Sequence, residues 1–320
     1  MAPVDLAAQR RQRRRNRAQA ILLLAGMGGV LALCAWLLAG GGGLLIVVAG
    51  TVVALATRPR VPPEWVLRAY GAHPLPPAAA PELHRLVGAL AARAELPARP
   101  RIAYVPSRAM NAFAVGRPHD AAIAVTDGLL RGLPGRELVG VLAHEVSHVR
   151  ADDLWIMTLA DTLGRLAHAL AYSGLALLVV GLPLWGAGAE ARAVLLVAVA
   201  LTLVPTAVTL LQLALSRSRE YDADVEAARL TGDPEGLAAA LHRLERAEGR
   251  IWERILVPRR RGPDPLLLRT HPPTEERVRR LRSLSLPRRR VIPVRDVPHP
   301  PAGYAPVRRP VRLRRPGVWW

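Results

Sequence analysis

Residues 141–149 read Val141-Leu142-Ala143-His144-Glu145-Val146-Ser147-His148-Val149. On a helix, positions i and i+4 lie on one face, so His144 and His148 can direct their imidazoles at a common ion, with Glu145 on the same side. The other positions are mostly apolar, which indicates a buried helix whose polar side chains converge. This spacing is typical of a zinc site in which the carboxylate reaches a metal-bound water. The alternative is a buried histidine pair satisfied by backbone carbonyls.

The composition is unusual for a soluble enzyme. Apolar residues make up 51% of the 320 residues and aromatic residues only 4%. All 44 basic side chains are arginines, and the formal net charge of +19 predicts attraction to anionic lipid headgroups or acidic partners. We expect no specific nucleic-acid partner. The single cysteine, Cys34, excludes a disulfide framework and a cysteine-based zinc site.

An uncharged run of forty residues follows a basic N-terminus at 1–17. No Asp, Glu, Lys or Arg occurs from Ala18 to Thr57. The run is twice the ~20 residues that one helix needs to cross a bilayer, and the glycines Gly40–Gly43 supply a turn near its middle. We therefore expect a transmembrane hairpin at 18–57, with arms at 18–38 and 44–57. A secretory signal peptide is the rival interpretation, but the apolar stretch is too long and resumes after the glycines.

Two more uncharged runs, 166–189 and 193–216, follow the histidine motif. Each is long enough to cross a bilayer, so we expect a second transmembrane hairpin at 166–216. A pair of buried core helices is the alternative, because Pro183 and Pro205 interrupt the runs. Four spans put both termini and the intervening domain on one side of the membrane. Arginines cluster on that side, next to the ends of the spans, which indicates the cytoplasm by the positive-inside bias.

The segments 58–165 and 217–286 have the character of one soluble domain that the second hairpin interrupts. Short strands are expected at 101–105, 112–115 and 121–125, and helices at 81–96, from 135, and at 217–230, 234–248 and 274–284. An uncovered edge of this small sheet would accept an extended peptide by strand addition. Proline and arginine dominate from 287 to 320, so this tail is expected to be disordered.

Two histidines leave a catalytic zinc ion short of ligands, because such sites usually have three protein ligands and one open position. Glu220 is the best candidate for the third ligand. It shares a helix face with Asp224, whose carboxylate can accept a hydrogen bond from the free N–H of a ligand histidine. The alternative is a surface acidic pair balanced by nearby arginines.

The expected reaction is metal-assisted hydrolysis of a peptide bond. Glu145 would act as general base toward the attacking water and then as general acid toward the leaving amine. A tetrahedral oxyanion needs a donor besides the metal. His271, which precedes two prolines, is our candidate for this donor, and a loop or capping histidine is the equally favoured alternative.

These residues resemble the pattern of the bacterial heat-shock membrane zinc protease HtpX and, more distantly, of the eukaryotic proteases that process prenylated CAAX proteins. The similar segments occur in the family's order and cover most of 101–284, at 111–116, 121–130, 141–153, 216–224 and 270–280. The basic N-terminus and the proline-arginine tail are not part of the family pattern.

The resemblance implies roles for individual residues. His144, His148 and Glu220 would be the ligands of one Zn²⁺ per chain, Glu145 the catalytic residue, and Asp224 a carboxylate behind the ligands. The substrate-binding edge strand would comprise Asn111, Ala112, Phe113 and Ala114.

The expected fold is therefore mainly α with a small β-sheet, an α-helical membrane protein with about four transmembrane helices carrying a gluzincin-type zinc protease domain. The expected function is cleavage of misfolded or membrane proteins at the cytoplasmic face of the bacterial inner membrane. A dedicated processing or signalling protease is the alternative among enzymes, and an inactive zinc-binding membrane scaffold is the alternative outside them. Glu145 argues against the scaffold, because a structural zinc site needs no base.

Overall fold

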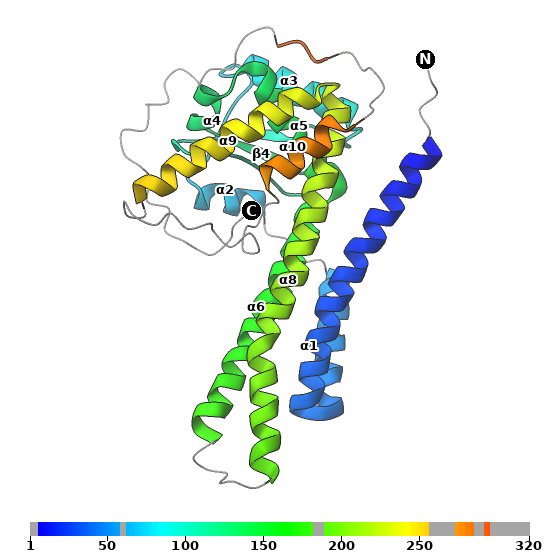
Figure 1. Cartoon of the computed structure of the whole chain (residues 1–320). Helices are drawn as coiled ribbons and strands as arrows, with labels where there is room; N and C mark the ends of the chain where they lie inside the picture. The colour runs from blue at the N-terminus through cyan, green and yellow to red at the C-terminus, as the bar shows by residue number, and fades with distance from the viewer. Residues whose placement is uncertain (1–5, 58–61, 182–188, 256–272, 285–290, 295–320) are drawn as a thin grey trace. The chain divides into compact units, whose positions relative to one another are not determined.

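The computed structural model describes residues 6–57, 62–181, 189–255, 273–284 and 291–294 (Figure 1). The chain divides into two compact units. The sheet unit comprises Val61–Leu154 and the residues from Arg219 onward, and the helical unit comprises Asp5–Arg60 and Trp155–Ser218. The sheet unit is thus built from two stretches that apolar helices separate in sequence. The division falls after Leu154 and Ser218, whereas the sequence pattern puts the boundaries after 165 and 216.

A mixed four-stranded sheet lies at the centre of the sheet unit. Its order is β1-β2-β4-β3, from β1 (His73–Pro74), β2 (Arg101–Val105), β3 (Ala112–Val115) and β4 (Ala122–Thr126). β2 and β4 are parallel, and the outer strands β1 and β3 are antiparallel to their neighbours. The three strands that the sequence predicts are confirmed within one residue. The short β1 is an addition, and β3 forms one edge of the sheet.

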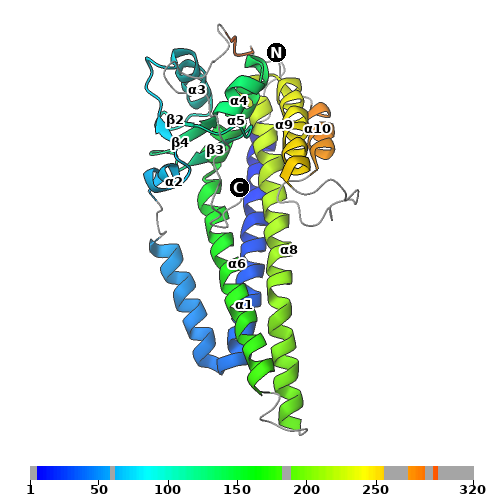
Figure 2. The same ribbon diagram turned by 90° about the vertical axis from the view of Figure 1, so that its left-hand side faces the viewer.

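Apolar side chains cover both faces of the sheet. On one face, α3 (Pro81–Arg93) and α5 (Gly135–Ala151) bury leucines such as Leu86 and Leu142 against Ile123 of β4. The other face holds a smaller cluster in which Phe113 of β3 packs beside Leu67 of α2 (Pro63–Ala69). The strand β3 is therefore held from both sides while its outer edge faces away from β4 (Figure 2).

Three further helices complete the sheet unit: α4 (Asp127–Gly132), α9 (Pro234–Ile255) and α10 (Thr274–Arg282). α9 packs closely on α5, where Gly140 lies against the backbone of Leu237. Bidentate ion pairs fix this packing, because Arg136 binds Asp233 and Arg243 of α9 binds Glu137.

Four residues of the expected disordered tail pack onto the sheet unit. In the segment Val291–Val294, Ile292 is buried in the main core and the Val294 side chain lies against Gly135. The Pro293 carbonyl also accepts a hydrogen bond from Arg85. For these four residues the expectation of disorder does not hold, and the rest of the tail, at 287–290 and 295–320, lies outside the described residues.

The helical unit begins with α1 (Leu6–Thr57), which is broken at Ala39 and Gly40. Gly40 has φ +57° and ψ −142°, a conformation that essentially only glycine adopts. The two arms fold back on one another (Figure 2), and a Cβ on Gly43 would stand 2.1 Å from the Ala35 carbonyl oxygen. The glycine cluster thus makes the predicted turn.

Two long helices, α6 (Asp153–Ala176) and α8 (Ala189–Thr231), pack together in the same unit, to which α8 belongs as far as Ser218. The last residues of α8, from Arg219, belong to the sheet unit. A short π-helix, η1 (Leu177–Gly181), follows α6. Their backbones approach closely, since a Cβ on Gly174 would stand 2.7 Å from Leu201 Cβ, and Gln212 donates a 2.5 Å hydrogen bond to Asp161. Pro205 is accommodated inside α8 without ending it.

Among the described residues, three helices are long and apolar enough to cross a membrane, at Ala18–Val53, Asp153–Val180 and Val194–Thr231. About four transmembrane helices were expected, and that number is not confirmed, because the first of these helices contains both arms of the broken α1. The large apolar side chains of these helices are widely exposed, as at Ile46 (74%) and Leu196 (71%). Such exposure argues against the alternative of buried core helices and fits contact with lipid.

Candidate metal centre

Helix α5 carries the motif with which the sequence analysis began. Its apolar side chains are buried, which confirms the predicted buried helix. These side chains are Leu138, Val141, Leu142, Val146 and Val149. His144 and His148 lie one turn apart with their rings nearly perpendicular at 88°. Their Nε2 atoms stand 3.1 Å apart and face the same point.

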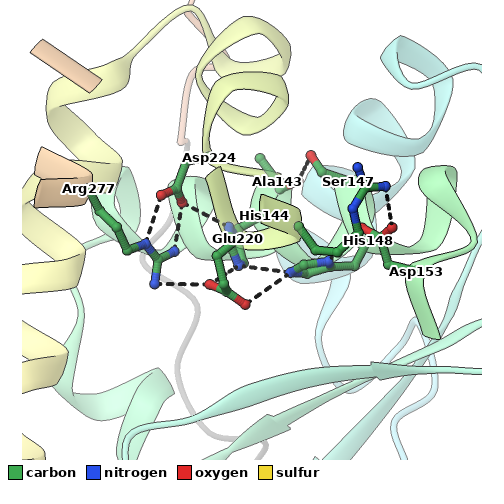
Figure 3. A network of polar contacts seen from close by, with 9 residues as sticks. Ala143, His144, Ser147, His148, Asp153, Glu220, Asp224 and Arg277 are labelled. Atoms are coloured by element: carbon green, nitrogen blue, oxygen red, sulfur yellow. Dashed lines mark hydrogen bonds and ion pairs between the residues drawn. The ribbon is translucent and has the colours of Figure 1, made fainter. Parts of the chain in front are cut away.

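Glu220 closes this site from α8, as Figure 3 shows. Its Oε2 lies 3.5 Å from His144 Nε2, and its Oε1 lies 3.6 Å from His148 Nε2. The two histidines and Glu220 all belong to the sheet unit, although Glu220 follows His148 by 72 positions. Within the described residues, His144, His148 and Glu220 form a group able to hold a metal ion.

The distances among these three side chains fit a metal site. With ligand bonds of about 2.0–2.2 Å, neighbouring ligands of a tetrahedral zinc ion stand about 3.3–3.6 Å apart. The observed separations of 3.1, 3.5 and 3.6 Å fall close to this range. Two imidazoles and a carboxylate are also the ligand types of catalytic zinc.

A carboxylate lies behind each histidine. Asp224 Oδ1 stands 3.1 Å from His144 Nδ1, and Asp153 Oδ2 stands 3.0 Å from His148 Nδ1. A carboxylate at Nδ1 fixes the ring orientation and leaves Nε2 free to bind a metal. The helical spacing of Glu220 and Asp224 predicts this role for Asp224, whereas no sequence pattern predicts it for Asp153.

Two buried arginines neutralise part of the acidic charge. Arg277 of α10 contacts Asp224 and Glu220, and Arg219 of α8 donates to Asp153 at 3.0 Å. The carboxylates gathered here are Glu145, Asp153, Glu220 and Asp224. These carboxylates outnumber the two arginines, and Arg219 is also shared with Asp222, so the group has an excess of negative charge that a bound cation would offset.

The titration of the site shows the same attraction for positive charge. Burial lowers the pKa of His144, but Asp224 and Glu220 outweigh it and raise that pKa above its ordinary value. For His148, burial is likewise outweighed by Asp153 and Glu220, and its pKa lies well above the ordinary value. Protons and a metal ion therefore compete for the same nitrogens.

Glu145 lies between the histidines and the edge strand. Its carboxylate accepts a hydrogen bond from the backbone N–H of Ala114, and burial raises the pKa of Glu145 above its ordinary value. A raised carboxyl pKa suits a group that accepts and returns a proton near neutral pH.

The strand β3 offers its outer backbone groups to this side of the site. Thr126 N–H donates to the Asn111 carbonyl at 3.1 Å, which makes these two residues a hydrogen-bonded pair. Because such pairs alternate along an antiparallel ladder, the backbone groups of Ala112 and Ala114 point away from β4. The side chain of Phe113 packs on the opposite face against Tyr70, with ring centroids 4.7 Å apart.

The structure thus gathers His144, Glu145, His148, Glu220 and Asp224 in one place and puts Asn111–Ala114 beside Glu145. His271 lies outside the described residues. Arg277 and Arg219, which no sequence motif indicates, complete the site.

Comparison with known proteins finds peptidases, in agreement with this site. Residues 77–285 match peptidase family M48. The chain is 38% identical over 239 residues to a protein named Protease HtpX homolog from Pyrococcus furiosus, covering 69% of this chain and 79% of that one. Proteins of the same name from Salinibacter ruber and Burkholderia mallei are 38% and 36% identical over 232 and 233 residues, and each alignment covers 69% of this chain and 80% of the relative.

Proposed function

Because this chain belongs to peptidase family M48, we propose that it is a zinc-dependent protease that cleaves misfolded or membrane proteins at the cytoplasmic face of a bacterial inner membrane. It is an HtpX-like metalloendopeptidase acting on polypeptides, and its apolar helices make it a membrane protein. The observation that carries the proposal is the convergence of His144, His148 and Glu220 on one point beside Glu145.

His144, His148 and Glu220 are the proposed zinc ligands, supported by their mutual distances and by the excess of negative charge around them. When bound, zinc would polarise the scissile carbonyl and lower the pKa of a coordinated water. Asp224 orients the His144 ring from behind.

Glu145 is the proposed general base. It accepts a proton from the attacking water at its carboxylate oxygen and delivers a proton to the nitrogen of the leaving amine. Its hydrogen bond to Ala114 N–H holds the carboxylate next to the strand edge. His271 is proposed to donate a hydrogen bond to the oxyanion, on the sequence argument alone.

Asn111, Ala112, Phe113 and Ala114 are the proposed binding edge for an extended substrate. Support comes from the edge position of β3 and from the outward backbone groups of Ala112 and Ala114. Main-chain pairing of this kind accepts many sequences, which suits a protease acting on unfolded segments. It also leaves open the alternative of a dedicated processing protease.

For the membrane we propose four spans, at 18–38, 44–57, 166–189 and 193–216. The break at Gly40, which divides α1 into two arms, supports the first hairpin. The soluble parts at 58–165 and 217–286 then share one side, which the flanking arginines assign to the cytoplasm, with the basic segment 1–17 and the tail 287–320. Anionic lipid is the expected surface partner of this basic chain.

The test is cleavage of an unfolded model substrate by the purified protein, loaded with zinc in detergent. Glu145→Gln should abolish cleavage while metal content stays at the parental level. Glu137→Gln, the same change two turns earlier on α5, is the matched control and should keep activity. Parental cleavage by the Glu145 variant would refute the proposed base.

Metal content tests the ligand set separately. Glu220→Ala should lose zinc, whereas Glu226→Ala, on the same helix, should retain it. Undiminished zinc binding by the Glu220 variant would refute its assignment as a ligand.

Sidedness is tested with single cysteines in a Cys34→Ser background. A cysteine in place of Ala187, at the far end of the proposed span 166–189, should react with a membrane-impermeant reagent on intact cells. One in place of the exposed Ser283 should react only after permeabilisation. The reverse pattern would contradict a cytoplasmic active site.

A further inference from the structure

Arg277 lies between two carboxylates of the site, Glu220 and Asp224. Its side chain is only 8% exposed, although arginine is rarely buried. Nε and one terminal nitrogen donate to the two oxygens of Asp224 at 2.7 Å each, and the other terminal nitrogen lies 3.1 Å from Glu220 Oε2 (Figure 3). One guanidinium thus joins both carboxylates.

This arrangement reaches both sides of the proposed metal site. Glu220 is a proposed ligand, and Asp224 lies against Nδ1 of His144, another proposed ligand. Glu220 and Asp224 stand one turn apart on α8, where two buried carboxylates repel each other. A planar fork with fixed donor directions removes this repulsion and sets the orientation of both carboxylates.

We propose that Arg277 is a positioning residue that holds Glu220 and Asp224 in the geometry in which the site binds its metal ion. The inference rests on the ligand set of the proposed function. Arg277 has no expected contact with substrate, since its guanidinium is buried and directed at the two carboxylates.

The sign of a change in metal affinity separates positioning from simple charge balance. Arg277 places a positive charge beside a ligand, so its removal would by charge alone strengthen the binding of a divalent cation. If Arg277 acts by positioning, its removal weakens binding instead, because the carboxylates are no longer held. Losing an outer partner of a metal ligand typically costs ten- to a hundredfold in affinity.

The experiment measures Zn²⁺ affinity by competition with a chelating dye, using the full-length protein in detergent. Arg277→Lys keeps the charge and loses the fork, and Arg277→Gln loses both. Both should bind zinc about ten- to a hundredfold more weakly. The matched control is Arg282→Lys on the same helix, whose exposed ion pair to Glu235 lies away from the ligands, and it should bind like the parent. Parental or tighter binding by Arg277→Gln would overturn the proposal.

Removing Arg277 also leaves a buried charge on Asp224, which can impair folding. The double variant Asp224→Asn/Arg277→Gln removes both charges and provides a folded test. Its zinc affinity should lie below that of Asp224→Asn alone, because Glu220 is then no longer held either, and binding equal to or tighter than that of Asp224→Asn would show that only charge balance matters. The visible spectrum of Co²⁺-substituted protein should also differ between Arg277→Lys and the parent, because it reports ligand geometry.

Glu220→Ala in the same assay tests the ligand set separately from the positioning role of Arg277. If Glu220→Ala binds zinc like the parent, the proposed ligand set is wrong. If it loses zinc while both Arg277 variants bind like the parent, the ligand set stands and only the positioning role is refuted.

Discussion

Substituting Gly140 by alanine should destabilise the packing of α5 on α9 while it stabilises α5 itself as a helix. The change in melting temperature measures which of the two effects is larger. A Cβ on Gly140 would stand 2.9 Å from Leu237 Cα and 3.0 Å from its backbone nitrogen. Backbone atoms cannot swing aside as a flexible side chain does, so α9 must shift by about 0.5–1 Å to restore ordinary contact at about 3.5–4.0 Å. The Arg136–Asp233 and Arg243–Glu137 pairs oppose that shift.

The magnitude follows from two opposing contributions. Alanine in place of glycine inside a helix gains about 1 kcal/mol, and overpacking a close contact costs about 1–3 kcal/mol. Gly140→Ala is therefore expected to be destabilising by roughly 0–2 kcal/mol. Gly88→Ala in α3 is the matched control, because its nearest neighbours are guanidinium atoms of Arg99 at 3.6 Å and beyond. It should gain the full ~1 kcal/mol, which separates the two variants by roughly 1–3 kcal/mol.

The assay is thermal unfolding in detergent, followed by circular dichroism. At about 2–4 °C per kcal/mol for a domain of this size, the two melting temperatures should differ by roughly 2–12 °C, with Gly140→Ala the lower. Equal shifts in the two variants would show that the close approach of Gly140 to Leu237 has no energetic consequence, and the reasoning would be refuted.

Three other predictions concern the site, the cap of α9 and the hairpin. Asp153→Asn should weaken Zn²⁺ binding about ten- to a hundredfold, since Asp153 orients His148. Asp222 pairs with Arg219, as Asp153 does, but does not contact His148, so Asp222→Asn should bind zinc like the parent. Equal losses of affinity in the two variants would mean that the loss comes from disturbing Arg219. Arg136 holds the pKa of Asp233 below its ordinary value, so this carboxylate stabilises the fold above about pH 4 and the contribution is lost as pH falls further. Asp233→Asn, which can still cap α9, should lower stability at pH 7 by roughly 0.5–1 kcal/mol, and this loss should shrink as the pH falls below about 4. A loss independent of pH, measured by urea unfolding, would contradict this origin. Gly43→Ala should lower the melting temperature of the purified protein, because the added Cβ clashes with the Ala35 carbonyl. Gly42→Ala is the control, since a Cβ there meets no atom within 4 Å, and its melting temperature should not fall. Equal melting temperatures of the two variants would argue against the tight turn.

The elements that the sequence predicts well are those whose signal is local. The strands at 101–105 and 112–115 follow from β-branched and apolar runs between turn residues, and the turn near Gly40 follows from a cluster of glycines in an uncharged run. The motif at 144–148 needs only helical spacing to bring two imidazoles together. In each case a few neighbouring residues contain the whole physical reason.

The parts that were missed depend on distant or unusual geometry. Asp153 is five positions after His148 and would not share its face on a continuous helix. It reaches His148 because Asp152 adopts a left-handed conformation, φ 56°, and ends α5 there. Arg277 meets Asp224 from 53 positions away, and no local pattern predicts that contact. The strand β1 contains Pro74, which weighs against a strand in any sequence-based prediction.

The division of the proposed metal site among α5, α8 and α10 sets an order of events during synthesis. The histidines leave the ribosome first, and Glu220 follows 72 residues later, about 4–14 s at 5–20 residues per second. Arg277 emerges later still, 57 residues after Glu220. A nascent chain therefore has no complete metal site until synthesis has passed Glu220, and the side chain proposed to hold that ligand in place comes only with Arg277.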